Sequence, residues 1–201
     1  MEVTRTRLAD GVYLTYLPAR KFKTSLLSAQ FVTPLTEETA SACALLPAVL
    51  RRGTVTYPDM GAMAARLDRL DGARIDYTVR KKGENQCVGF VASMIDDSLV
   101  PGGERLLEPV AELLGELICD PATERGRFVS AYFESEKTNV IDTIRSIIND
   151  KRDYADSRLL EVMCAGEADG LPRLGSEESA QQLQPHKLYT LSETLIATAQ
   201  L

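Results

Sequence analysis

The amino-acid sequence predicts an α+β domain, with an antiparallel sheet of about five strands and helices packed on one of its faces. Two observations support this fold class. Short runs rich in β-forming residues open the chain and return near its middle. The second half instead repeats apolar residues at the three- and four-residue spacing of amphipathic helices. Because the expected order is strands, two helices, a hairpin and then helices, an antiparallel sheet covered by a helical layer is expected.

The bulk composition bounds the possible functions. The chain has 201 residues, of which 44% are hydrophobic and 26% charged, as in ordinary globular proteins. Its net charge of −6 argues against general binding to nucleic acid or to anionic membranes, because both require neutralisation of phosphates. The sequence has no apolar run of membrane-spanning length and no signal peptide at its first residues. We therefore expect one cytoplasmic domain that binds neither nucleic acid nor membrane.

Two hairpins are expected to supply most of the strands. The first turns at Asp10 and Gly11, a strong hairpin signal because both residue types tolerate positive φ angles. The second turns at residues 81–84, between two runs of alternating side chains. With one further strand between the hairpins, the expected strands are residues 3–8, 12–17, 25–33, 73–80 and 85–94.

Capping residues and apolar spacing indicate the helices. Thr36 and Thr39 are candidate caps of the first helix, and Pro47 inside that helix should kink it. Arg51 and Arg52 follow it, where positive charge complements the helix dipole. The expected helices are residues 36–50, 60–70, 106–120, 127–148, 151–163 and 176–183, with a last helix beginning at Pro185.

The cysteines give no sign of a metal or redox motif. They lie more than 30 residues apart, so no C-x-x-C pair exists. All have apolar neighbours, and we expect free, buried thiols in a reducing compartment: Cys43, Cys87, Cys119 and Cys164.

Several short motifs follow one another in an order that resembles a known family. They are Leu8-x-x-Gly11, Gly53-Thr54, Leu70-Asp71-Gly72-Ala73, Glu136-Lys137-x-x-Val140, Asp150-Lys151-Arg152-x-Tyr154-Ala155 with Arg158-Leu159, and Leu174-Gly175-Ser176-Glu177-Glu178. Together they resemble the N-terminal repeat domain of the pitrilysin/insulinase family, the inverted-zincin peptidases. The resemblance runs essentially end to end and implies the same α+β fold.

The resemblance also implies that the zinc site of the family is missing. Active members carry H-x-x-E-H on the first helix, five residues before the Gly-Thr pair, and a further glutamate on the long helix. Counting along the motifs places these groups at residues that cannot perform their chemistry: Ala44 and Ala48 for the histidines, Pro47 for the general base and Thr143 for the third ligand. The only histidine, His186, lies far downstream and is expected at the surface. We therefore expect an inactive homologue with no metal and no cofactor.

The predicted strand at residues 73–80 is a candidate for binding peptide. In active relatives this strand forms the sheet edge beside the zinc and adds an extended substrate through main-chain bonds. If binding is retained, the contacts are Arg74, Ile75, Asp76, Tyr77 and Thr78. The alternative to peptide binding is an ordinary edge strand whose charges discourage aggregation. The alternative to a binding role for Tyr77 is a side chain that packs in the core.

The family organisation indicates the function. Its members join two or four such domains, so residues 1–201 are expected to form the first half of a two-domain protein. The favoured function is a non-catalytic subunit that forms a heterodimer with an H-x-x-E-H-bearing, insulinase-like peptidase and helps to enclose an extended peptide. Mitochondrial processing peptidase divides its labour in this way. Two alternatives stay open, namely an assembly module that binds no peptide, and a zinc peptidase whose ligands lie outside this chain.

Overall fold

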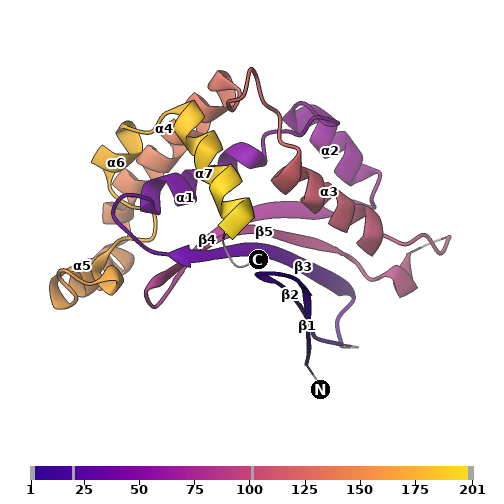
Figure 1. Cartoon of the computed structure of the whole chain (residues 1–201). Helices are drawn as coiled ribbons and strands as arrows, with labels where there is room; N and C mark the ends of the chain where they lie inside the picture. Colours follow the sequence, from indigo (N-terminus) through magenta and orange to yellow (C-terminus); the bar gives the residue numbers. More distant parts are fainter. Residues whose placement is uncertain (1–2, 20, 101, 199–201) are drawn as a thin grey trace.

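The computed structural model describes residues 3–19, 21–100 and 102–198, and it confirms the α+β class (Figure 1). The five strands of the described residues are β1 (Thr4–Ala9), β2 (Val12–Tyr16), β3 (Thr24–Pro34), β4 (Arg74–Lys82) and β5 (Asn85–Ile95). In Figure 1 the helices other than α5 (Lys151–Met163) lie above the sheet that contains β3, β4 and β5, whereas α5 lies beside its left end and β1 and β2 extend below it.

The expected single sheet of five strands is wrong, because the strands form two sheets. β1 and β2 pair with each other as a separate antiparallel hairpin, and the other three strands pair in the order β3-β5-β4. Every described residue of β1 and β2 is at least partly exposed. Alternating side chains indicate that a segment is extended and which face it buries, but they do not identify the neighbouring strand.

The central strand β5 defines the core face of the three-stranded sheet. Val88, Phe90, Ala92 and Met94 alternate along it and are at most 3% exposed. Phe31 of β3 lies opposite Val88 and is also buried. The helices therefore cover the face on which these side chains lie.

Gly89 of β5 lies too close to β3 to carry a side chain. A Cβ atom on Gly89 would lie 2.2 Å from the carbonyl oxygen of Ala29. Gly89→Ala should force the two strands apart and lower the free energy of unfolding by about 1–3 kcal/mol, the usual range for overpacking. Urea denaturation measures this loss, and Gly115→Ala is the control, since a Cβ there meets no atom within 4 Å. Equal stability of the two variants would contradict the close approach.

The first helix, α1, forms the centre of the fold. All eleven residues of α1 (Ala40–Leu50) are buried, as expected for a helix that is apolar on every side. The helix runs without interruption through Pro47. Thr39 occupies the N-cap position of α1, as predicted, but its side chain makes no cap bond. Thr36 Oγ1 accepts from the main-chain N–H of Thr39 at 3.3 Å, in the turn before the helix.

The helices other than α1 are α2 (Met60–Asp68), α3 (Leu107–Cys119), α4 (Ser130–Ser146), α5 (Lys151–Met163), α6 (Glu177–Gln181) and α7 (Pro185–Thr198). In Figure 1, α4, α6 and α7 lie around α1, α2 and α3 lie over the right-hand part of the sheet, and α5 lies at the lower left. None of the helices in the described ranges combines the length and apolarity needed to cross a membrane.

The cysteines are all free, but only two of them are buried. Cys43 and Cys87 lie in the core as predicted, whereas Cys119 is exposed and Cys164 is half-buried. The prediction of four buried thiols is thus wrong for the last two. Cys119 ends α3, and Cys164 follows α5, a helix with no buried residue.

Burial should separate the thiols by reactivity. Removal from water raises the pKa of Cys43 to about 11, although a hydrogen bond with Thr39 opposes the shift. With this pKa, about one Cys43 side chain in a thousand is ionised at pH 8. The thiolate is the reactive form, so Cys43 should react slowly. A chromogenic disulfide reagent at pH 8 should modify Cys119 and Cys164 rapidly and all four thiols only after denaturation. Rapid modification of Cys43 in the folded chain would contradict this assignment.

Candidate functional site

Three of the four positions that correspond to the zinc site lie inside the core on α1. Ala44 and Ala48, one helical turn apart, are 1% and 2% exposed, and Pro47 between them is also buried. The side chains at these positions offer only methyl and methylene groups. They therefore supply no metal ligand and no base.

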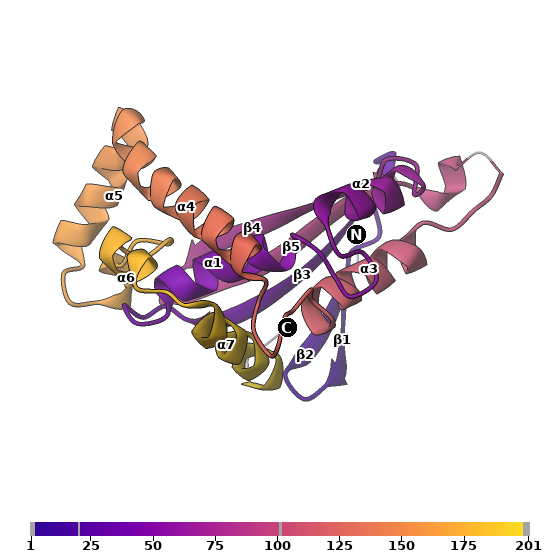
Figure 2. The ribbon, with the colours of Figure 1, turned by 90° about the horizontal axis from the view of Figure 1, so that it is seen from above.

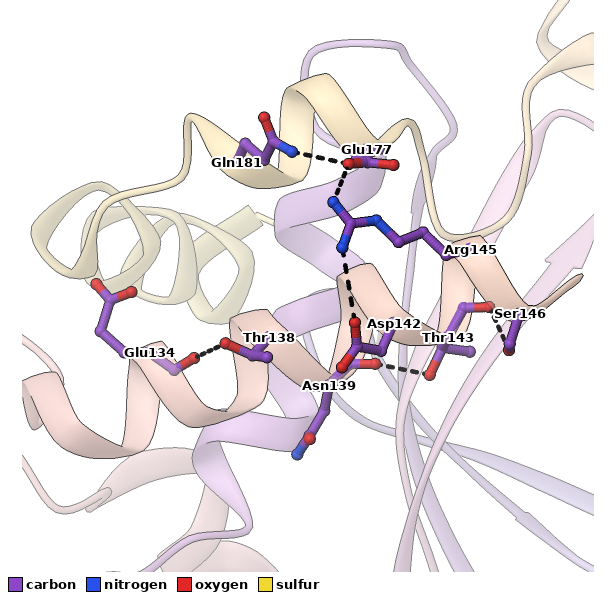
Figure 3. Close-up of polar contacts among 9 residues, drawn as sticks. All are labelled: Glu134, Thr138, Asn139, Asp142, Thr143, Arg145, Ser146, Glu177 and Gln181. Carbon is purple, nitrogen blue, oxygen red and sulfur yellow. Dashed lines mark hydrogen bonds and ion pairs between the residues drawn. The ribbon is translucent and has the colours of Figure 1, made fainter.

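The fourth position, Thr143, lies exposed on α4 and uses its hydroxyl within its own helix. Thr143 Oγ1 donates to the carbonyl oxygen of Asn139 at 2.7 Å, and the carbonyl of Thr143 accepts a hydrogen bond from Ser146 Oγ (Figure 3). This arrangement satisfies the hydroxyl locally and directs it along the helix. Within the residues that the structure describes, no group of three or more His, Cys, Asp or Glu side chains could hold a metal ion.

The acidic residue next to Thr143 takes part in a link between α4 and α6. Arg145 lies between Asp142 and Glu177, and Gln181 donates to the same Glu177 oxygen that accepts from Arg145 (Figure 3). The hydrogen bond from Arg145 holds the pKa of Glu177 below its usual value. Since a lowered carboxyl pKa favours the charged form, this link persists at neutral pH and weakens only in acid.

A second ion pair joins Arg52, which lies just after the end of α1, to Glu136 on α4. Glu136 is 8% exposed, and its Oε1 accepts from Arg52 Nε at 2.5 Å. Its other oxygen accepts from Asn139 Nδ2 at 3.1 Å, and Arg52 also donates to Ser135 Oγ. Arg52 was expected to complement the helix dipole, but its side chain instead reaches a carboxylate on another helix. The two helices that carry the zinc-site positions are thus held together without metal.

Removing the charge of Glu136 should destabilise the chain. Glu136→Gln leaves the partly buried Arg52 without its anion, and we expect a loss of about 1.5–3 kcal/mol in the free energy of unfolding, typical of hydrogen bonds to charged groups. Urea denaturation measures the loss, with Glu134→Gln as the matched control on the exposed side of α4. A double-mutant cycle with Arg52→Met isolates the pairwise energy. A coupling energy near zero would show that the pair is incidental.

The candidate peptide-binding strand, β4, lies at an edge of the three-stranded sheet. One side of β4 pairs with β5, and the other faces no strand of the described part of the chain. Arg74 and Asp76 are exposed and Thr78 is half-buried. Ile75, in contrast, is only 5% exposed, so its side chain is not accessible to a peptide.

Arg51 fixes β4 to the end of α1. Its guanidinium donates to the carbonyl oxygen of Ile75 at 3.1 Å and to Asp76 Oδ1 at 2.9 Å. It also lies 5.8 Å from the centre of the Tyr77 ring. Tyr77 is 42% exposed, so the interpretation of this side chain as a core residue is wrong. Sequence reasoning missed the contact because nothing in the spacing of Arg51 and Asp76 indicates that they meet.

The remaining predicted residue, His186, is exposed in the first turn of α7, as expected. It lies outside the α1, α4 and β4 arrangement described above.

Comparison with known proteins identifies a curated relative. No family model matches the chain. The chain is 30% identical over 191 residues to the Bacillus subtilis (strain 168) protein named "Probable inactive metalloprotease YmfF". The match covers 95% of this chain and 45% of the relative, so the chain spans about half the length of that protein.

Solved structures show the same fold. A conserved protein from Enterococcus faecalis V583 superposes with a TM-score of 0.89 at 26% identity, over 98% of this chain and 47% of that one. A peptidase M16 inactive domain from Pseudomonas fluorescens superposes with a TM-score of 0.69 at 15% identity, over 99% of this chain and 44% of that one. The chain is thus similar to a probable inactive metalloprotease and has the fold of an inactive M16 peptidase domain, and its own zinc-site positions are occupied by Ala44, Pro47, Ala48 and Thr143.

Proposed function

We propose that this chain is the first half of a larger, cytoplasmic M16-like protein that binds an extended peptide without cleaving it. In this proposal the protein forms a heterodimer with an H-x-x-E-H-bearing peptidase and helps to enclose that enzyme's substrate. The observation that carries the proposal is the open edge of β4, which Arg51 fixes to the helix that has lost its zinc-site residues.

The geometry of β4 supports binding by strand addition. An edge strand presents main-chain N–H and C=O groups with which an extended peptide can pair as one more strand. On β4 the carbonyls of Ile75 and Val79 accept from Arg51 and Arg173, so a peptide would pair with the remaining groups of that edge or displace these side chains. Arg74, Tyr77 and Thr78 add side-chain contacts that are at least partly accessible. None of these interactions requires a metal or a base, so binding can persist after the catalytic groups have been lost.

The other parts of the proposal have separate support. The curated relative is about twice as long as the matched region, which leaves room for a second half. The four free thiols agree with a reducing compartment.

Fluorescence anisotropy with labelled ten-residue peptides tests strand addition. A peptide of alternating Thr and Val should bind, and the same peptide with N-methyl groups on every second residue should not, because methylation removes the pairing donors from one edge. Tyr77→Ala should weaken binding of the unmethylated peptide. Absence of binding by either peptide would favour the assembly module, and equal binding of both would contradict strand addition.

Two further measurements test the partner and the lack of metal. Co-expression of the full-length protein with an H-x-x-E-H-bearing M16 peptidase should yield a stable complex in analytical ultracentrifugation. Elemental analysis of the untagged chain should find well under one zinc per molecule. Separate sedimentation of the two proteins would refute the heterodimer, and stoichiometric zinc would refute the inactive assignment.

A further inference from the structure

Side chains occupy part of the open edge of β4. The carbonyls of Ile75 and Val79 accept hydrogen bonds from the guanidinium groups of Arg51, at 3.1 Å, and of Arg173, at 3.4 Å. In an antiparallel pair, every second residue directs its main-chain groups away from the neighbouring strand, so Tyr77 also faces outward. Within the described part of the chain, the outward N–H and C=O groups of Tyr77 form no hydrogen bond. Two arginines therefore cap the edge on either side of one uncapped residue.

The edge is also basic, on a chain whose net charge is −6. β4 carries a single acid, Asp76, and the ion pair of Asp76 with Arg51 is the only one that β4 forms among the described residues. The cations of the strand are Arg74, Arg80, Lys81 and Lys82. This local excess of positive charge favours an acidic ligand and disfavours a basic one.

The acidic residues of α5 limit the basic stretch at the turn between β4 and β5. Figure 2 shows β4 at one edge of the sheet, with α2 near its first residues and α5 beyond the turn. A cavity of about 730 Å³ beside β4 is enclosed there by the turn, by the C-terminal end of α4, by α5 and by the loop before α6. Asp153 and Asp156 of α5 line this cavity together with Lys81. An acidic peptide should therefore pair with residues 74–79 and end before the cavity.

A carboxylate is a stronger acceptor for these arginines than a main-chain carbonyl. In the bond to a carbonyl only the donor is charged, whereas with a carboxylate both partners are charged and the pair is often bidentate. A guanidinium has five N–H donors, so Arg51 can keep Asp76 while it binds a second carboxylate. An acidic side chain of a peptide would draw Arg51 away from the Ile75 carbonyl, which then accepts from a peptide N–H. An uncharged peptide would have to displace the same guanidinium into water.

The positions of the two capped carbonyls define a spacing. Ile75 and Val79 are four residues apart on one strand, so the residues opposite them on an added strand are also four apart. Because side chains alternate with a period of two, both of those peptide side chains lie on the same face. Two acidic residues at this spacing would engage both arginines at once.

We propose that Arg51 and Arg173 gate the β4 edge, and that they select extended peptides with two acidic side chains four positions apart over uncharged peptides. The inference rests on the peptide binding proposed above and names the class of peptide. Main-chain pairing is nearly independent of sequence, whereas two guanidinium groups at fixed positions discriminate both charge and spacing.

Fluorescence anisotropy with four ten-residue peptides tests this selection. The first alternates Thr and Val, the second has Asp in place of two Thr residues four positions apart, and the third has Lys at the same two positions. The fourth carries its two Asp residues side by side, on opposite faces of the strand. The second peptide should bind about tenfold more tightly than the first, equal to about 1.4 kcal/mol. The third should bind more weakly than the first, and the fourth should lose most of the gain.

Charge-removing variants separate the two arginines from the general charge of β4. A variant that combines Arg51→Met with Arg173→Met should lose the preference for the Asp peptide. It should bind the uncharged peptide at least as tightly as the wild type, because the carbonyls of Ile75 and Val79 are then uncapped. Arg80→Met is the matched control, since Arg80 is exposed on the same strand, and it should retain the preference.

Urea denaturation establishes that each variant is folded. Arg173 is exposed, so the fold should tolerate Arg173→Met alone. This single variant should reduce the preference and keeps the test decisive if the change at Arg51 unfolds the chain. The main-chain amide signal of Tyr77 in NMR of the whole chain reports pairing itself, and both the Asp peptide and the uncharged peptide should shift it.

Each outcome decides between the two proposals. A shift of the Tyr77 signal with equal affinity for the Asp and the uncharged peptides would overturn the selection and leave strand addition intact. No shift with any peptide would overturn peptide binding and the selection together. A preference that persists in the combined variant, or that Arg80→Met removes equally, would assign the effect to the general charge of β4 and overturn the role of the two arginines.

Discussion

Restoring the two histidines by Ala44→His and Ala48→His should destabilise the chain without creating a zinc site. Both positions are at most 2% exposed, and an imidazole is much larger than a methyl group. Overpacking costs about 1–3 kcal/mol at each position, so we expect a total loss of about 2–6 kcal/mol. An imidazole without a hydrogen-bond partner would add to this loss. On α4, the Thr143 hydroxyl remains bonded to the Asn139 carbonyl.

Urea denaturation and zinc titration calorimetry check this expectation. Thr143→Glu is the control at an exposed position, and its effect on the free energy of unfolding should stay within about 0.5 kcal/mol. The decisive variant adds Pro47→Glu and Thr143→Glu to the two histidines. Wild-type stability and one bound zinc in that variant would show that the core around α1 still has room for a catalytic site.

Phe133→Ala should cause a loss of about 3–5 kcal/mol in the free energy of unfolding, the range for removal of a buried aromatic side chain. Phe133 is fully buried and lies on the same face of α4 as Glu136 and Val140. Truncation would leave a cavity beneath the helix and remove the contact between the ring and the Lys137 ammonium, which lies 5.7 Å from the ring centre.

Thermal and urea denaturation measure this loss, with Phe22→Ala as the control. Phe22 is 60% exposed, and its truncation should change the free energy of unfolding by no more than about 0.5 kcal/mol. A loss below about 1 kcal/mol in Phe133→Ala would mean that α4 repacks onto the core, and that this helix contributes less to the fold than its burial implies.

Local interactions account for the features that could be predicted from the sequence. The bounds of α5 agree with the prediction because Asp150 accepts hydrogen bonds from the main-chain N–H groups of Arg152 and Asp153, a signal contained within four residues. α7 starts at Pro185 as expected, since proline suits a first helical position. The loss of the zinc site was also predictable, because it depends only on which residues occupy the motif positions.

Long-range contacts account for the features that could not be predicted. The ion pairs of Arg51 with Asp76 and of Arg52 with Glu136 join residues 25 and 84 positions apart, and neither pair forms part of a periodic pattern. The separate β1–β2 hairpin depends on which strands meet, which alternation does not encode. The cavity beside β4 collects residues from four segments of the chain, so it exists only once they are packed.

The position of β5 between its two neighbours has a consequence for the order of folding. β4 and β5 are joined by a short turn at Gly83, whereas the pairing of β3 with β5 closes a loop that extends from Pro34 to Asn85. Loop-closure entropy grows with this separation, so the β4–β5 hairpin should form before β3 joins it. Stopped-flow refolding of variants in β3 and β4 can resolve this order. The strand whose edge is proposed to receive a peptide would then be among the earliest parts of the chain to take shape.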